Sequence, residues 1–363
     1  MVAASRPLVK TLIAASGLNK LKQFYQNIRA TSKFILLRLC ATSPKLSSIY
    51  YALASSAMER EHQGVIYGRL QYQKSLTVSQ EPQYLLRRNI HRLEKGLIMR
   101  PRRDIFALDY LEETVTAYRD SLNQQDNRGD RDGELKWAHD VLQEYFTVVV
   151  THPIIDRAKA MFMTLKPIEG EQKYIPYHRD LDRPLTVNYD RFLSLSQRRR
   201  SVRWYLPQPV PRELIDRAIT AAALSPSACN RQPFEFRVFD DPDLIQQVGS
   251  IPMGTSGFSQ NFPALIVVVG KLRAYYSERD RHVIYIDASL ASMSLMYALE
   301  TLGLSSCPIN WPDIASKERQ MRQVLDLEPD EKVVMLISFG YPHPEGMVPF
   351  SQKKSLAEIR RYN

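Results

Sequence analysis

Residues 226–233 read Pro-Ser-Ala-Cys-Asn-Arg-Gln-Pro, and this stretch separates a helical pattern from a strand-like one. Before it, apolar residues recur at spacings of three and four in a helix opened by Pro211. After it, residues 234–239 (FEFRVF) are typical of a strand. Polar side chains between two prolines favour a rigid, extended loop whose backbone groups can contact a flat ligand. Taken alone, the stretch fits an ordinary helix-to-strand turn equally well.

The same alternation continues toward the C-terminus. Residues 264–270 (ALIVVVG) predict a buried strand, and residues 305–310 and 332–340 predict two more. Residues 282–302 form a helical pattern that is apolar nearly all round, so we expect it to be covered on every side, in a core or in an oligomer interface. Strands separated by helices predict an α/β or α+β layer structure.

Three further segments flank these elements. Arg198-Arg199-Arg200-Ser201-Val202-Arg203 places four guanidinium groups and a hydroxyl within six residues. Guanidinium groups bind phosphate bidentately, although such a run taken alone is more often a solvated surface. Residues 303–311 (GLSSCPINW) follow the apolar helix, and Gln352-Lys353-Lys354 lies near the C-terminus.

In this order and spacing, the four segments resemble the nitroreductase family. Residues 199–205 (RRSVRWY) match its RRSxRxY-like start, and residues 226–233 match its PSxxNxQP loop. Residues 303–311 match a GLG-type turn that leads to a strand beside the flavin, and Lys353-Lys354 matches a closing basic pair. The resemblance covers residues 192–363. It implies an α+β fold, a mainly antiparallel sheet wrapped by helices, in an intertwined homodimer with FMN at the interface.

The resemblance also implies the residues that bind the cofactor. The matching positions are Arg199, Arg200, Ser201 and Arg203 for the phosphate, ribityl chain and pyrimidine edge; Ser227, Asn230 and Gln232 in the loop from the partner subunit; Pro308, Ile309, Asn310 and Trp311 at the strand end near flavin N5; and Lys353 with Lys354 at the phosphate. No catalytic acid or base and no metal ligand is predicted, because the redox step belongs to the flavin.

Two positions depart from the family pattern. The position of Asn310 is often acidic, and that of Trp311 is often glycine, so the tryptophan is expected to stack on the ring or to narrow the substrate space. Gln260-Asn261 is the nearest match to the mid-domain flavin contact of the family. Cys307 has no neighbouring histidine or acid in the sequence and is interpreted as a small buried residue, not as a nucleophile.

For the function, the resemblance implies ping-pong transfer of two electrons from NADH or NADPH, through FMN, to an unidentified acceptor. One alternative is a flavin dehydrogenase that oxidises a bound peptide or small molecule. Another is a non-catalytic flavin-binding adaptor with a membrane-surface N-terminus.

The N-terminal half has a different character. Residues 1–58 contain eight basic residues and no acidic one, which accounts for most of the net charge of +10. From Leu8 to Cys40 the pattern is helical with an apolar stripe through Leu18, Leu21, Tyr25 and Ile28, and it holds no apolar run long enough to span a bilayer. The stripe fits packing within the protein, contact with an anionic membrane surface, a targeting segment or a nucleic-acid arm; the absence of interleaved aromatic residues argues against nucleic acid.

The remaining organisation follows from composition. Residues 59–165 predict a helical domain, with helices near 81–97, 108–122 and 134–150 and a polar loop at 123–133. Residues 166–191 are rich in proline and predict a linker to the domain at 192–363. The three cysteines, Cys40, Cys229 and Cys307, have neither metal-ligand spacing nor a disulfide pattern, so a reducing compartment is expected. We therefore predict a cytoplasmic protein, with a peripheral membrane location as the variant.

Overall fold

The computed structural model describes residues 6–76, 84–123, 132–168 and 170–362, and the side chains of its first helix from Gln23 onward. Internal packing divides the chain into two units, Met1–Gln63 and Gly64–Asn363. Each unit is described by itself. The polar loop predicted at residues 123–133 lies mostly outside the described residues.

The first unit consists of helices. They are α1 (Arg6–Cys40), α2 (Pro44–Leu53), the short turn Ser56–Met58 and the start of α3 (Glu59–Ser75). The helix expected between Leu8 and Cys40 is confirmed. The side chains of Leu18 and Leu21 lie outside the described residues, and those of Tyr25 and Ile28 are exposed. The apolar residues 34–37 are also exposed, and four consecutive helical residues point to successive sides. The apolar surface of α1 is therefore wider than one stripe.

The second unit begins with a helical region whose predicted helices are present. Its elements are α4 (Tyr84–Leu97), α5 (Leu111–Leu122), α6 (Asp132–Val148) and α7 (Pro153–Met163). Leu86, Ile90 and Leu93 recur on one face of α4 and are fully buried, as the spacing predicts. They pack with Tyr118 of α5 and Leu142 of α6 into one core, which we call the helical core.

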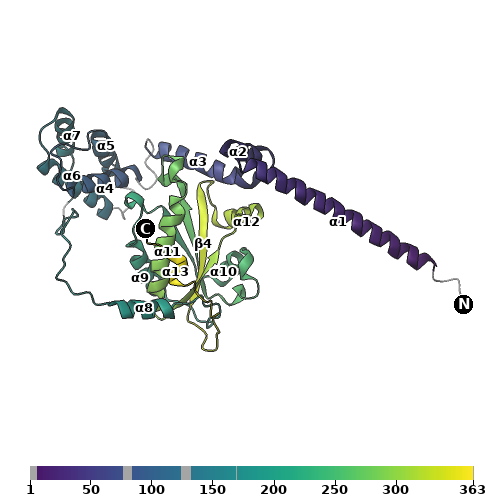
Figure 1. Cartoon of the computed structure of the whole chain (residues 1–363). Coiled ribbons are helices and arrows are strands. Elements are labelled where there is room, and N and C mark those ends of the chain that lie inside the picture. Colours follow the sequence, from purple (N-terminus) through teal and green to yellow (C-terminus); the bar gives the residue numbers. More distant parts are fainter. Residues whose placement is uncertain (1–5, 77–83, 124–131, 169, 363) are drawn as a thin grey trace. The chain divides into compact units, whose positions relative to one another are not determined.

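The C-terminal half of the chain contains a four-stranded antiparallel sheet. Its strands are β1 (Phe234–Phe239), β2 (Ala264–Lys271), β3 (Ser305–Asn310) and β4 (Glu331–Gly340), in the order β1-β2-β4-β3. Figure 1 labels β4 in this sheet. All four predicted strands are confirmed, and so is the expected α+β fold with a mainly antiparallel sheet wrapped by helices.

Helices cover both faces of this sheet. Because side chains alternate along a strand, Leu265, Val267 and Val269 of β2 face one core, and Ile266 and Val268 face the other. The first core is closed by α10 (Pro242–Gly249) and α12 (Ala315–Leu325), and the second by α9 (Arg212–Ala223) and α11 (Val283–Thr301). Burial on both faces explains why β2 reads as a continuous apolar run.

Helix α11 is less completely covered than its sequence predicts. Ile284, Leu295 and Leu299 are fully buried against the sheet, but Ile286 and Leu290 are 58% and 45% exposed. Within a single chain, one apolar face of this helix therefore remains uncovered. Among the described residues, the segment Glu278–Thr301 also has the length and composition to cross a bilayer, although α11 packs on the sheet as a core helix does.

The remaining elements connect these layers. Helix α8 (Tyr189–Arg198) is capped by Asn188, whose side chain accepts a hydrogen bond from the Arg191 amide at 2.9 Å, so it crosses the boundary expected at residues 191 and 192. In α3, a Cβ atom at Gly68 would lie 2.9 Å from the backbone carbon of Leu272. Only glycine allows this close approach. The last helix, α13, spans Leu356–Ile359, and short 3-10 turns occupy Ala228–Asn230 (η3), Met253–Thr255, Ser259–Asn261, Leu272–Ala274 and Glu278–Asp280.

Candidate functional site

The arginine-rich segment is held against the edge strand β3. Ser201 forms a parallel bridge with Ser306, and the Val202 amide donates to the Ser306 carbonyl at 3.1 Å. At the first residue of the segment, the Arg198 guanidinium donates to the buried Glu300 carboxylate at 2.9 Å. These contacts place the arginine segment (residues 198–203) and the segment of residues 303–311 side by side.

Two buried polar atoms at this junction have no hydrogen-bond partner. They are Nε of Arg199 and Oγ of Ser306. Leaving such an atom unsatisfied in a protein interior costs about 1–3 kcal/mol. An anionic, hydroxyl-rich ligand would satisfy both, because the guanidinium donates to phosphate oxygens and a serine hydroxyl can donate or accept. This donor set fits the phosphate and ribityl chain of FMN.

A contact from Arg200 brings the C-terminal segment to the same place. Its guanidinium donates to the Phe350 carbonyl at 2.7 Å. Lys353 and Lys354 follow within four residues and are exposed. Among the described residues, neither lysine forms an ion pair, so both ammonium groups can meet an anion beside Arg199 and Arg200.

Arg203 points into a more apolar environment. Its guanidinium lies 5.7 Å from the ring centre of Phe258 and donates to the Ser201 carbonyl at 3.2 Å. Burial raises the pKa of the neighbouring Cys307 thiol, although the positive charge of Arg203 opposes the shift. The thiol is therefore protonated at neutral pH, which agrees with the interpretation of Cys307 as a small buried residue.

The predicted strand end consists of residues with unequal exposure. Ile309 is buried, Pro308 is half-buried and Asn310 is exposed at the end of β3. The Trp311 ring packs against the core that α10 and α12 close, and its indole N–H donates to the Glu318 carboxylate of α12. This hydrogen bond and the packing fix the position of the tryptophan ring.

The remaining segment, the loop of residues 226–233, is anchored elsewhere. The Ala228 amide donates to the carboxylate of Asp287, near the start of α11, at 2.9 Å, and the backbone amide of Gln232 donates to Ser227 Oγ at 3.0 Å. Burial raises the pKa of Asp287, while the Ala228 amide opposes this shift. We call this part of the chain the cofactor loop.

Within one chain, the cofactor loop and the arginine segment lie far apart. The loop is tied to Asp287 and the arginine segment to Glu300, near opposite ends of α11. Thirteen residues of helix between them correspond to about 20 Å. Among the described residues, no hydrogen bond or ion pair joins the two. The structure thus brings three of the four predicted segments together and leaves the cofactor loop apart.

Other residues near the site are placed by the structure as follows from their hydrogen bonds. Gln260 and Asn261 use their side-chain amides within the protein: Gln260 donates to the Gly257 carbonyl at 2.9 Å, and Asn261 accepts from the Tyr205 amide at 3.1 Å. Ser306 is not among the residues predicted for the site, although it lies next to Cys307 in the segment of residues 303–311. Arg87, in a separate helical region, has no signal in the sequence that would connect it with the cofactor loop.

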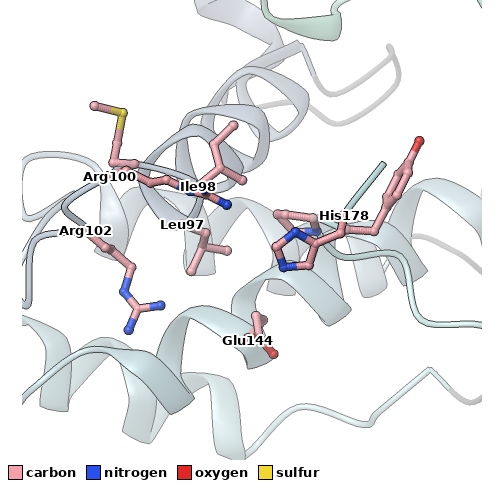
Figure 2. A pocket seen from close by; sticks show the side chains of 9 residues that line it. Leu97, Ile98, Arg100, Arg102, Glu144 and His178 are labelled. Atoms are coloured by element: carbon pink, nitrogen blue, oxygen red, sulfur yellow. The ribbon is translucent and has the colours of Figure 1, made fainter. Parts of the chain in front are cut away.

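The structure also contains a cavity in the helical region, of about 450 Å³. Figure 2 shows Leu97, Arg102, Glu144 and His178 around it. It joins the end of α4 and the loop after it to α6 and to the segment at residues 176–178. None of the thirteen predicted site residues lines this cavity, so it is separate from the candidate site.

Comparison with known proteins identifies the family of this part of the chain. Residues 197–256 and 251–341 match the model of the nitroreductase family. The C-terminal domain belongs to the nitroreductase family. The matched range includes the arginine segment, the cofactor loop and strand β3.

The nitroreductase-family domain is also similar to curated relatives. Iodotyrosine deiodinase 1 of Pongo abelii is 28% identical over 199 residues, which are 46% of this chain and 67% of the relative. Iodotyrosine deiodinase of Nematostella vectensis is 26% identical over 226 residues, 53% of this chain and 83% of the relative. The family and these names support an enzyme of the oxidoreductase type.

Solved structures with a similar C-terminal half include an FMN-dependent nitroreductase from Clostridium difficile R20291. It is 25% identical, with a TM-score of 0.41, and the match covers 47% of this chain and 99% of that one. A nitroreductase from Desulfovibrio desulfuricans, solved in complex with FMN, is 24% identical with a TM-score of 0.41 and covers 49% of this chain and 98% of that one.

Proposed function

We propose that the protein is an FMN-dependent oxidoreductase. The observation that carries this proposal is the pair of unsatisfied buried atoms, Arg199 Nε and Ser306 Oγ, at the junction where the basic residues gather. When bound, FMN supplies the two-electron redox chemistry. No metal ligand is required, and among the described residues no cluster of potential metal ligands occurs.

The chain itself provides binding, orientation and electrostatics. Arg199, Arg200 and the pair Lys353-Lys354 hold the phosphate, which carries nearly two negative charges. Arg203 holds the pyrimidine edge, where a positive charge stabilises electron density on the reduced ring. The end of β3 provides its backbone beside the reactive edge, and Trp311 bounds the substrate space on that side.

We further propose that the active form is a homodimer. The cofactor loop and the arginine segment lie about 20 Å apart along α11, which is too far for both to hold one flavin head within a chain. A two-fold axis perpendicular to α11, at its uncovered face, would place two copies of the helix antiparallel to each other. The loop of one chain would then meet the arginine segment of its partner, and Ser227, Asn230 and Gln232 would complete the site.

In this proposal the electron donor is NADH or NADPH, and transfer is ping-pong, with the donor and the acceptor reacting in turn. The acceptor is a small molecule. A second candidate function is reductive removal of iodide from an iodinated phenol, and its support is the name shared by the curated relatives. That reaction replaces iodide by hydrogen on the ring carbon, and the two electrons it consumes would come from reduced FMN held by the arginine segment.

The spectrum of the purified protein tests the proposal. We expect a yellow protein that releases FMN on denaturation and is bleached anaerobically by reduced nicotinamide. Addition of 3-iodotyrosine to the bleached protein separates the two candidates, because only the second predicts re-oxidation with release of iodide. A colourless protein that does not bind added FMN at micromolar concentration would exclude both.

For the N-terminal unit we propose contact with an anionic membrane surface, in a protein otherwise located in the cytoplasm. Residues 1–58 contain eight basic residues and no acidic one, and this charge and the exposed apolar residues of α1 support the proposal. Sedimentation with anionic vesicles should occur for the full chain and fall as salt rises, and a chain without residues 1–58 should remain in solution. Equal behaviour of both chains would exclude the proposal.

A further inference from the structure

Arg87 links the helical region to the cofactor loop. It lies in the first turn of α4, and its guanidinium crosses to η3 and the residues after it. Nε donates to the Asn230 carbonyl at 2.9 Å, and a terminal nitrogen donates to Oε1 of Gln232 at 3.0 Å. Both acceptors belong to positions that the family resemblance assigns to the flavin.

The rest of the arginine is held by the helical region. Its other terminal nitrogen lies 3.6 Å from the Glu134 carboxylate of α6, and the guanidinium lies 5.6 Å from the ring centre of Trp137. The side chains of Arg87 and Glu134 are only 16% and 19% exposed. A charge-assisted bond from a group fixed in this way is stronger and better directed than one from a solvated side chain.

The loop needs such an anchor because its backbone is strained. Cys229, Asn230 and Gln232 have φ angles of 54°, 51° and 49°, in the left-handed region that side-chain-bearing residues rarely adopt. Strain of this kind persists only where surrounding contacts impose it. Arg87 holds the backbone of Asn230 and the side chain of Gln232, whose amide nitrogen also donates to the Ala223 carbonyl at 2.8 Å.

This arrangement leaves one ligand-binding group of the loop, the side chain of Asn230, available. Among the described residues, the side-chain amide of Asn230 forms no hydrogen bond, while its carbonyl is occupied by Arg87. The arginine therefore fixes the main chain of the loop and leaves the Asn230 side chain for a ligand.

We propose that Arg87 is a positioning residue for the cofactor loop, so that the helical region forms part of the flavin site. The inference rests on the proposed function. Because binding free energies are reciprocal, FMN should in turn strengthen the attachment of the helical region.

Binding of FMN to the flavin-free protein tests the inference. The variants are Arg87→Ala, Arg87→Lys and, as a matched control, Arg92→Ala. Arg92 lies on the same helix but pairs with Asp109 at 3.3 Å and packs on the Tyr110 ring, so its loss perturbs the helical region without touching the loop. We expect Arg87→Ala to weaken FMN binding about tenfold, Arg87→Lys to have an intermediate effect, and Arg92→Ala to change it by less than about twofold.

Hydrogen exchange provides a readout independent of the flavin. In the flavin-free Arg87→Ala protein, the amides of residues 228–232 should exchange faster than in the unmodified chain, while those of β2 should not change. An unchanged FMN affinity in Arg87→Ala would overturn the inference, and so would a loss of affinity in Arg92→Ala equal to that in Arg87→Ala. Failure of the unmodified chain to bind FMN would instead refute the proposed function.

Discussion

The helical core and the nitroreductase-family domain differ in how fully they satisfy their own polar groups. In the helical region, buried polar side chains find partners nearby: the Tyr118 hydroxyl lies 3.0 Å from Nδ1 of His139, and the Tyr145 hydroxyl donates to the Phe106 carbonyl at 2.7 Å. In the C-terminal domain, Nε of Arg199, Nε of Arg231 and Oγ of Ser306 are buried without a hydrogen bond.

This difference indicates which region is complete as a single chain. The helical core closes on itself, whereas the C-terminal domain keeps unsatisfied donors and an uncovered apolar face on α11. Among the described residues of the helical region, the unsatisfied buried carboxylate oxygen is that of Glu134, whose charge partner is Arg87, the arginine that reaches the cofactor loop. A self-sufficient scaffold therefore adjoins a domain whose unsatisfied donors and uncovered apolar face support the proposed flavin site and dimer.

The largest expected effect comes from charging the uncovered face of α11. The double change Ile286→Asp and Leu290→Asp should convert a dimer into a monomer, because carboxylates would be buried in an apolar contact. FMN affinity should fall by about a hundredfold or more, because the bonds from the partner's cofactor loop are lost. Light scattering and FMN titration measure both quantities.

The matched control for that experiment is Leu244→Asp on α10, where the side chain is 43% exposed on the other face of the sheet. It should leave mass and FMN affinity unchanged. If the charged α11 variant stays dimeric and binds FMN normally, the uncovered face of α11 is not a dimer interface that completes the flavin site.

The next effect concerns the unsatisfied guanidinium. Arg199→Ala should weaken FMN binding by about 1.5–3 kcal/mol, one to two decades, because a charged hydrogen bond to phosphate is lost. Lys353→Ala should act in the same direction, and less strongly because that side chain is exposed. Arg217→Ala, an exposed arginine of α9, is the control in the same titration. Equal affinities for all three would mean that the phosphate lies elsewhere.

A third change examines the packing of α3 on the C-terminal domain. Gly68→Ala should lower the free energy of unfolding by about 1–3 kcal/mol, because its Cβ would lie 2.9 Å from the backbone of Leu272. Gly133→Ala in α6 is the matched control, since a Cβ there meets no atom within 4 Å and alanine favours a helix. Denaturant unfolding compares the two, and equal stability in both variants would contradict the close approach of α3.

The smallest effect is a pH dependence confined to the helical core. Burial lowers the pKa of His139 below its ordinary value of 6.5, and the nearby Asp140 opposes this shift. The unfolded chain therefore binds a proton more readily, so stability is complete above pH 6.5 and falls as the pH drops toward the folded-state pKa. The slope from this group is at most about 1.4 kcal/mol per pH unit.

Hydrogen exchange of the α6 amides between pH 7.5 and 5.5, corrected for intrinsic exchange rates, measures this change. His139→Gln should flatten the profile, because it removes the titrating group and retains a hydrogen-bond partner for Tyr118. An unchanged profile would assign the pH dependence to other residues.

Much of the fold follows from local sequence patterns. The four strands and two helices of the C-terminal half, α9 and α11, agree with the predicted ranges within a few residues, because the continuous apolar run of β2 and the apolar spacing of α9 are local properties of the chain. Helices α10 and α12 were not predicted. The arginine segment and the cofactor loop were likewise found from residue type and order. Their chemical roles remain predictions that the experiments above address.

Only the tertiary structure decided which of these groups lie together. No local pattern could show that Ser201 pairs with Ser306, that the cofactor loop and the arginine segment are tied near opposite ends of α11, or that Arg87 crosses from another region to Asn230. The two contacts of Ser201 and Arg87 join residues separated by more than a hundred positions. The sequence by itself determined which elements form and which residues can bind an anion. The packing between distant segments decided which of these residues share a site, because such contacts arise only when the whole domain is folded.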